Sequence, residues 1–333
     1  MAAMPSAPHC VSGERARGPR LTLTAALFAF AGLAAAALVA LAAGPADAAF
    51  PGHPGLIAYD NSQQSGGGES EEDCVSENDS IFTARADGSQ RTRLAKGVDP
   101  SYSPNGQLIA FSICDGIQSD LMVMNSDGTG VRAITSTPKV SEEEAAFSAD
   151  GKRIYFSRDS GGEGYSQIYS IGVDGSGLRQ LTPKRHETSD SHPAAAPNGR
   201  FVVFDREGEL YTMRPNGTHL KKLTPGWDPA VSPTSNRIAY SFRGQIYLIG
   251  AAGGGPRQLT HLKSGHFAEA IALAPAFSPD GSWIAFALEE SISNGPGFND
   301  AQKLDKVSLR TGKVVTLTKT SVGGSHPDWQ PLP

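Results

Sequence analysis

The sequence predicts an all-β protein, a six-bladed β-propeller with four antiparallel strands in each blade. Three observations support this prediction: an apolar triplet that recurs six times, an Asx-Gly turn before most copies of it, and a C-terminal strand that belongs to no complete unit. The composition agrees, because Gly (38) and Pro (23) are abundant and only 19% of the 333 residues are charged. Such a mixture is typical of turn-rich β proteins.

The recurring triplet marks the second strand of each blade and ends in an aromatic residue. The six copies are 57–59 (IAY), 109–111 (IAF), 154–156 (IYF), 202–204 (VVF), 238–240 (IAY) and 284–286 (IAF). They follow one another at intervals of 36 to 52 residues. A period of this length is typical of a propeller blade of four short strands.

Turn signals separate the strands inside each unit. Pairs such as Asn105-Gly106 lie between the first strand and the triplet, and Asx-Gly between apolar runs predicts a hairpin because the turn needs positive φ. A third strand follows, for example 167–170, and then a second Gly turn. We predict that the fourth strand ends in Leu-Thr or Ile-Thr, as at Leu181-Thr182.

The two ends of the chain predict how the ring closes. The first unit begins at Gly55 and lacks a first strand, whereas 325–331 (SHPDWQP) at the C-terminus is a strand without a unit. Pairing this strand into blade one completes the ring and leaves no open sheet edge. We therefore expect a single propeller domain over residues 49–333.

Residues 1–48 have the features of a secretory signal peptide. Three arginines (Arg15, Arg17, Arg20) precede the apolar run 21–43, and small residues at 45–49 suit cleavage after Ala48. The alternative is an uncleaved membrane anchor, because a run of this length can span a bilayer. Either way we expect an exported chain that is periplasmic, envelope-associated or secreted, with no membrane span after cleavage. The formal net charge of −5 argues against a nucleic-acid partner.

Two cysteines remain once the signal peptide, with Cys10, is removed. An even pair in an oxidising compartment favours a disulfide, although two free thiols are the alternative. Cys74 and Cys114 follow the second strands of blades one and two, and equivalent loops of neighbouring blades emerge on one face. We predict a Cys74–Cys114 disulfide.

The repeat unit resembles that of a known family. The pattern P-x-(F/Y/W)-S-P-(D/N)-G-x-x-I-A-F, followed by I-Y and D-G and then L-T, is similar to the WD40-like (PD40) repeat of TolB-type β-propellers, and the resemblance covers the whole chain after the signal peptide. The propeller starts within ten residues of the predicted cleavage site, which leaves no room for the N-terminal α/β domain of TolB, so we do not extend the resemblance to a partnership with Pal. The chain is also similar to the propeller of prolyl-oligopeptidase-type peptidases, but it has no G-x-S-x-G and no room for their hydrolase domain.

One aligned position of the repeat, a column in the alignment of the six blades, holds mostly ionisable residues. The first strands of a propeller line its central channel, and the residues three places before Tyr102 and its counterparts are Asp99, Glu144, His192, Asp228, Ala274 and His326. Pro follows Asp99, His192, Asp228 and His326. The five ionisable residues predict one of three roles: ligands of a divalent cation such as Ca²⁺ or Mn²⁺, a site for a partner's basic side chain or N-terminus, or a solvated wall whose carboxylates bind backbone N–H groups.

No catalytic motif marks any of these residues as a nucleophile or general base. We therefore expect an exported, monomeric, non-enzymatic binding protein that presents a propeller face and channel mouth to a protein or peptide. The alternative is a metal-assisted lyase or lactonase-type hydrolase with its site in the channel. A bound metal with an open coordination position would favour the enzyme, whereas a plugged channel and a large exposed apolar patch would favour the binding protein.

Overall fold

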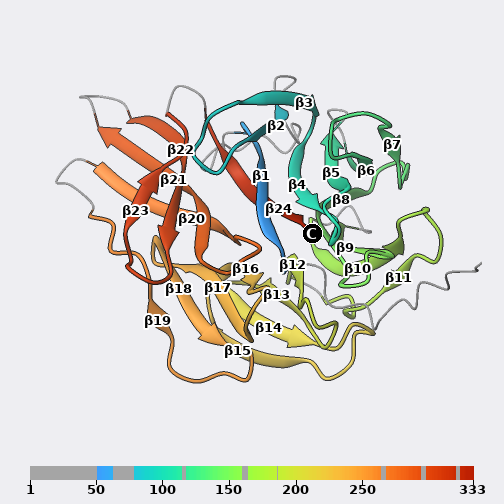
Figure 1. Cartoon of the computed structure of the whole chain (residues 1–333). Coiled ribbons are helices and arrows are strands. Elements are labelled where there is room, and N and C mark those ends of the chain that lie inside the picture. The colour runs from blue at the N-terminus through green and yellow to red at the C-terminus, as the bar shows by residue number, and fades with distance from the viewer. Residues whose placement is uncertain are drawn as a thin grey trace, which may run out of the picture. The chain divides into compact units, whose positions relative to one another are not determined.

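The computed structural model has six four-stranded antiparallel sheets, each one blade, arranged around a central channel (Figure 1). It describes residues 51–62, 79–114, 118–159, 164–185, 187–263, 268–293, 298–319 and 323–333. The predicted signal peptide and Cys74 lie outside these ranges. The predicted six-bladed architecture is confirmed.

In five blades the strands run outward from the channel in chain order, and in blade one the C-terminal strand lies innermost, followed by the first three strands of the chain. The innermost strands are β24 (Ser325–Leu332), β4 (Val98–Tyr102), β8 (Ser141–Phe147), β12 (Asp190–Ala195), β16 (Trp227–Val231) and β20 (Ala268–Phe277). The second strands are β1 (His53–Asp60), β5 (Leu108–Cys114), β9 (Arg153–Asp159), β13 (Val202–Arg206), β17 (Arg237–Phe242) and β21 (Trp283–Ser293). The third strands are β2 (Ser80–Ala84), β6 (Ser119–Asn125), β10 (Ser166–Gly172), β14 (Glu209–Met213), β18 (Gln245–Gly250) and β22 (Phe298–Ser308). The outermost strands are β3 (Thr92–Lys96), β7 (Arg132–Ala133), β11 (Arg179–Gln180), β15 (Lys221–Pro225), β19 (Arg257–Gln258) and β23 (Val314–Thr316).

The C-terminal strand closes the ring as predicted. β24 pairs antiparallel with β1 and so becomes the innermost strand of blade one. Each innermost strand contacts the innermost strands of its two neighbours, including β24 with both β4 and β20. The Gln330 side chain ties this junction further, since its Nε2 donates to the Gly106 carbonyl of blade two at 2.9 Å.

Every blade has a β-bulge on its innermost strand, opposite the aromatic residue of the triplet. In blade two, Val98 pairs with Ser112 and Ser101 with Ala110, so that Asp99 and Pro100 together face Phe111. The same two-against-one register recurs in the other five blades. The first bulge residue has positive φ in all six blades, between 41° and 58°. These are the six residues of the predicted ring.

The Ser-Pro-Asn-Gly phrase is turn chemistry. Ser103 Oγ donates to Asn105 Oδ1 at 2.8 Å and accepts the Leu108 N–H at 2.9 Å, while Gly106 takes the positive φ of the turn. Ser148 and Ser278 make the equivalent pair of bonds in blades three and six. The motif therefore fixes the hairpin and leaves the channel chemistry to other residues.

The Leu-Thr signature differs from its prediction, because in four blades the outermost strand ends before it. In blade three, β11 stops at Gln180, and Thr182 Oγ1 then accepts the Ile168 N–H of β10 at 3.0 Å. Thr135, Thr260 and Thr318 do the same in blades two, five and six. A hydroxyl thus replaces a backbone acceptor where the outer strand ends, and the leucine before it is buried in the blade.

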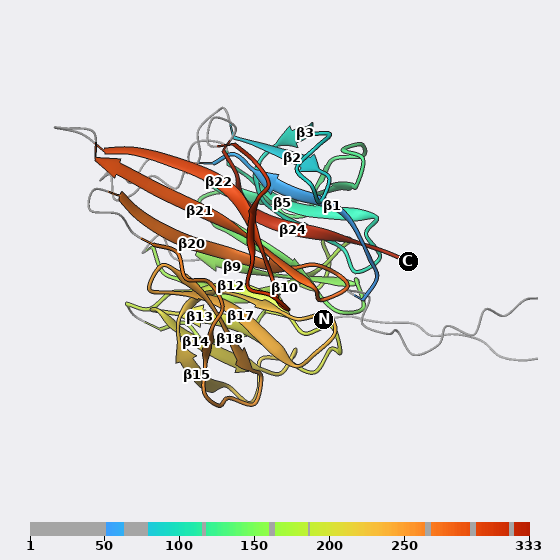
Figure 2. The same ribbon diagram turned by 60° about the vertical axis from the view of Figure 1, so that its left-hand side comes forward.

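Blade six is longer than the others. β21 and β22 each have 11 residues, and their hairpin extends past the other blades in Figure 2. None of the residues that the structure describes belongs to a helix with the length and apolar character needed to cross a membrane.

Candidate functional site in the central channel

The channel contains a cavity of about 1060 Å³, part of which is open solvent. All six ring residues line it, so the column predicted from the sequence does converge on one space. Pro or Ala follows each of them along the wall, and Pro275 after Ala274 raises the number of prolines at this level to five. Among the described residues no side chain plugs this cavity, so that feature, which would favour the binding protein over the enzyme, is not found. Five large apolar residues are exposed within the described ranges, and they come from separate blades: Val131, Leu178, Leu220, Trp227 and Leu332.

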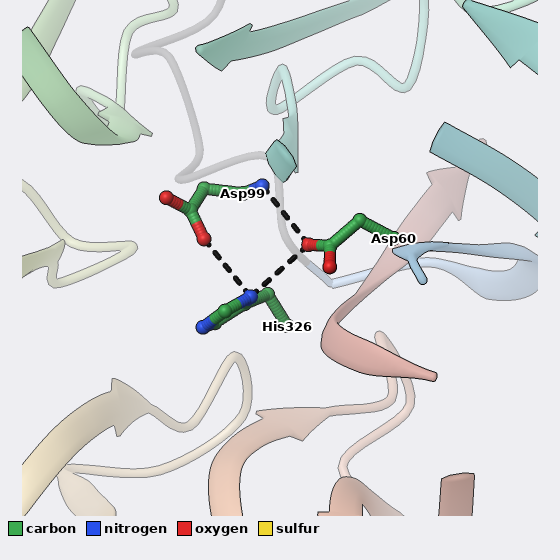
Figure 3. A group of neighbouring side chains, drawn as sticks. All are labelled: Asp60, Asp99 and His326. Atoms are coloured by element: carbon green, nitrogen blue, oxygen red, sulfur yellow. Dashed lines mark hydrogen bonds and ion pairs between the residues drawn. The ribbon is translucent and has the colours of Figure 1, made fainter. Parts of the chain in front are cut away.

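His326 anchors the first of two ionic clusters in the ring. Its Nδ1 lies 3.0 Å from Asp60 Oδ2 and 2.9 Å from Asp99 Oδ1 (Figure 3). Asp60 Oδ2 also accepts the backbone N–H of Asp99 at 3.0 Å. Asp60 is fully buried at the end of β1, so this cluster joins the C-terminal strand to blades one and two.

His192 anchors the second cluster, across the ring. Its Nδ1 lies 2.9 Å from Asp205 Oδ1, and its Nε2 lies 3.1 Å from Glu144 Oε1 and 3.4 Å from Asp228 Oδ1. Asp205 is buried on β13 and also accepts the Asp228 N–H at 3.3 Å. Blades one and four, which carry the two histidines, are three blades apart, and in each case the following blade supplies a ring aspartate.

Ring carboxylates also bind the backbone of the next blade. Glu144 Oε2 accepts the His192 N–H at 2.6 Å, and Asp228 Oδ2 accepts the Ala274 N–H at 3.2 Å. Where the ring residue is histidine, Asp60 or Asp205 behind it takes over this role. The bulges expose these N–H groups, and the carboxylates satisfy them. The ring carboxylates therefore stabilise the fold by accepting these backbone hydrogen bonds.

The ring carries imidazolium rather than imidazole. Burial lowers the pKa of His192, but the negative charges of Glu144, Asp228 and Asp205 outweigh it and raise that pKa well above 6.5. Asp99 and Asp60 do the same for the pKa of His326. Although burial opposes it, the His326 charge also lowers the pKa of Asp99, whereas burial dominates at Glu144 and raises its pKa.

Two aspartates that contact the ring histidines were not predicted from the sequence. Asp60 and Asp205 directly follow the aromatic residue of their triplets, where the other blades have Ser112, Ser157, Ser241 and Ala287. The two columns vary together within this one chain: histidine in the ring accompanies aspartate, a ring carboxylate accompanies serine, and Ala274 accompanies Ala287. Comparing these columns would have identified both residues.

Two further carboxyl groups near the ring were also missed. Asp328 lines the cavity two residues after His326, where the other blades have Ser101 or alanine. It accepts the Tyr102 N–H at 2.6 Å and the Trp329 N–H at 2.9 Å, and burial raises its pKa to about 7. Glu143 accepts the Ser119 hydroxyl at 2.7 Å, and burial raises its pKa to about 7.

Two groups of side chains have the donors and spacing for a metal ion within the described part of the chain. They are Asp60 with Asp99 and His326, and His192 with Asp205 and Asp228, and the donor atoms of each group lie within 4.8 Å of one another. The predicted single ring is thus divided between two possible metal sites, and Glu144 belongs to neither of these two groups. Cys114 ends β5, and its predicted partner Cys74 lies outside the described residues, so the disulfide stays a prediction.

Comparison with known proteins finds a matching family model and several relatives. Residues 80–243 match the model of the TolB β-propeller domain. A TolB homologue of Chlorobium chlorochromatii is 30% identical over 165 residues, covering 42% of this chain and 35% of that protein. The uncharacterised peptidase YuxL of Bacillus subtilis is 27% identical over 210 residues, covering 59% of this chain and 30% of that protein. The chain thus spans about a third of the length of these relatives.

Solved structures share the fold at low sequence identity. Hydrazine synthase of Kuenenia stuttgartiensis superposes with a TM-score of 0.61 at 14% identity, over 84% of this chain and 47% of that one. A chain of the nidogen/laminin complex superposes with a TM-score of 0.58 at 11% identity, over 83% of this chain and 98% of that one. At such identities the likeness concerns the fold alone.

Proposed function

Because this chain carries a TolB-like β-propeller, we propose that it is an exported, non-enzymatic binding protein that receives a protein or peptide partner at the mouth of its central channel. The observation that supports this proposal is the open cavity, whose wall combines one level of ionised side chains with a collar of proline and alanine. Its N-terminal segment, with the features of a signal peptide, supports export.

The wall of the channel is suited to binding because it is rigid. Proline and alanine have almost no side-chain entropy to lose when a partner covers them. The ionised side chains are held in place by one another and by backbone N–H groups, as at Glu144 and Asp228. A preorganised surface of this kind loses little free energy to ordering on association.

Blocking the channel tests this function without altering a charged residue. Ala274 is the one ring residue without a polar side chain, and Ala274→Leu would extend an apolar side chain into the cavity. We expect native envelope proteins captured by the wild-type protein to be lost from this variant. Glu209→Gln, on the outer part of blade four where Glu209 pairs with Lys222, is the control. Identical capture by the wild type and Ala274→Leu would contradict binding at the channel.

The metal-dependent enzyme has one observation in its favour, the two His/Asp/Asp groups. A metal there must displace the proton from an imidazole whose pKa is raised well above its ordinary value. Calorimetric titration with Ca²⁺, Mn²⁺ and Zn²⁺ tests this alternative. Tight binding that His192→Gln or His326→Gln abolishes would favour the enzyme over the binding protein.

A further inference from the structure

The channel contains more acidic groups than basic groups. Four carboxyl side chains (Asp99, Glu144, Asp228, Asp328) and two imidazoles line the cavity, and among the described residues no lysine or arginine does. Two more carboxyl groups, Asp60 and Asp205, lie directly behind the imidazoles. Six carboxyl groups therefore surround two imidazoles.

The geometry shows where this excess lies. His326 is bound through Nδ1 by both Asp60 and Asp99, and His192 is bound by Asp205, Glu144 and Asp228. Asp328 accepts the backbone N–H groups of Tyr102 and Trp329. In each cluster the carboxyl groups outnumber the imidazole. Ala274 leaves one side of the ring without an ionisable side chain, and that side faces Glu144 across the channel.

The rest of the wall is apolar. Phe147, Phe277 and Trp329 line the cavity beyond the proline level. Trp329 is 3% exposed, and its Nε1 has no hydrogen-bond partner within the described part of the chain. These three rings and the prolines that follow the ring residues are buried in the blades, and the partly exposed apolar residues of the wall include Ala146, Ala194, Ala195, Ala230 and Val231. Small apolar side chains next to carboxylates are suited to an organic cation with an apolar stem, because the stem loses contact with water against them. A hydrated metal ion gains no favourable contact from an apolar wall.

We propose that the channel binds a primary ammonium group carried on an apolar stem, with the ammonium among Asp99, Glu144 and Asp228 and the stem against the partly exposed alanine and valine side chains of the wall. The inference rests on the proposed function and names the chemistry by which the partner is recognised. Two sources offer this chemistry: the free N-terminus of a peptide and a small alkylamine.

Isothermal titration calorimetry with four probes tests this inference on the mature protein. The probes are hexylammonium chloride, sodium hexanoate, an alanine tetrapeptide with a free N-terminus, and the same peptide N-acetylated. We expect a cationic probe to bind, hexanoate not to bind, and acetylation to weaken the peptide at least about tenfold, the effect of losing one charge-assisted hydrogen bond. Tighter binding of the peptide than of hexylammonium identifies a peptide terminus as the source, and the reverse identifies a small amine.

Variants separate a channel site from general charge attraction. Glu144→Gln and Asp228→Asn should each weaken the cationic probe, Ala274→Leu should abolish its binding, and Glu209→Gln should leave it unchanged. Equal binding of hexylammonium and hexanoate, binding that Ala274→Leu leaves intact, or binding of Ca²⁺ or Mn²⁺ without any cationic probe would overturn the inference.

If partner capture depends on the channel while no cationic probe binds, the inference fails and the proposed function stands. If probes bind but capture does not depend on the channel, the proposed function fails instead.

Discussion

The two halves of the ring contain the same ionic unit in different settings. In blades one and two, Asp60, His326 and Asp99 join residues 266 positions apart in the sequence. In blades four and five, Asp205, His192 and Asp228 join neighbouring strands of a continuous segment. His192 has Glu144 as a third carboxylate, whereas Ala274 stands at the corresponding place before His326. The same contacts therefore close the ring in one half and shape the channel wall in the other.

This difference predicts that the two clusters contribute unequally to the stability of the ring. The His326 cluster joins the last strand to the first, so its loss should affect the whole ring. The His192 cluster lies inside chain-continuous blades and retains other carboxylates when one is removed. A substitution in one cluster can be compared with the equivalent substitution in the other cluster.

The largest effect is expected from removing the buried aspartates. Asp60→Ala leaves the His326 charge with Asp99 alone and should lower the free energy of unfolding by about 3 to 5 kcal/mol, as is usual when one partner of a buried pair is removed. Asp205→Ala should cost less, because His192 keeps Glu144 and Asp228. Urea denaturation of both variants measures the difference. Equal losses would show that ring closure adds nothing to the His326 cluster.

The imidazolium groups should make stability depend on pH above neutrality. Their pKa values are raised in the folded state, so their contribution is complete below the ordinary value of 6.5 and is lost as pH rises through the raised pKa. Thermal denaturation from pH 6 to pH 9 should show a falling melting temperature. His192→Gln and His326→Gln should each reduce the slope, and an unchanged slope in both variants would refute the assignment of charge.

Asp328 has no counterpart in the other half, where Ala194 occupies its place. Burial raises its pKa to about 7 from an ordinary 3.8, so the folded protein binds a proton that the unfolded chain has released. Its contribution to stability should fall as pH rises from about 4 to about 7. Asp328→Asn keeps an acceptor for Tyr102 N–H and should flatten that part of the pH profile. A wild-type slope in the variant would assign the proton to another group, such as Glu143.

The smallest effect should come from the ring position without a charge. Ala274 has a φ of 47°, which glycine adopts without strain, so Ala274→Gly gains about 1 kcal/mol in backbone conformation and loses a similar amount to the freer unfolded chain. We expect a change in unfolding free energy within about 0.5 kcal/mol. Glu144→Gly should be clearly destabilising, since it also removes the bonds to His192 and Ser157. Similar results for both variants would mean that backbone conformation alone selects the residues of the ring.

The sequence was sufficient for the fold because each blade repeats the same local signals. The triplets, the Asx-Gly turns and the strand at 325–331 gave six blades and their closure, and alignment of the repeats found the ring column. That alignment did not reveal the pairing of His326 with Asp60, because the ring column was not compared with the column that follows the triplet. The contact itself depends on the side-chain rotamers at a bulge and on which strand lies behind it. The role of the Leu-Thr signature also became clear only from the structure. A threonine whose hydroxyl replaces a backbone acceptor looks the same in the sequence as a threonine at the end of a strand.

The bulge has a consequence for how such a protein can change over time. Its extra residue lies outside the regular pairing and projects into the channel, while the aromatic residue opposite stays buried in the blade. A substitution there alters what the channel offers without repacking the blade, which explains how histidine, aspartate, glutamate and alanine share one position in six similar sheets. The column therefore allows the side chains that line the channel to differ from blade to blade while the strand pairing stays the same.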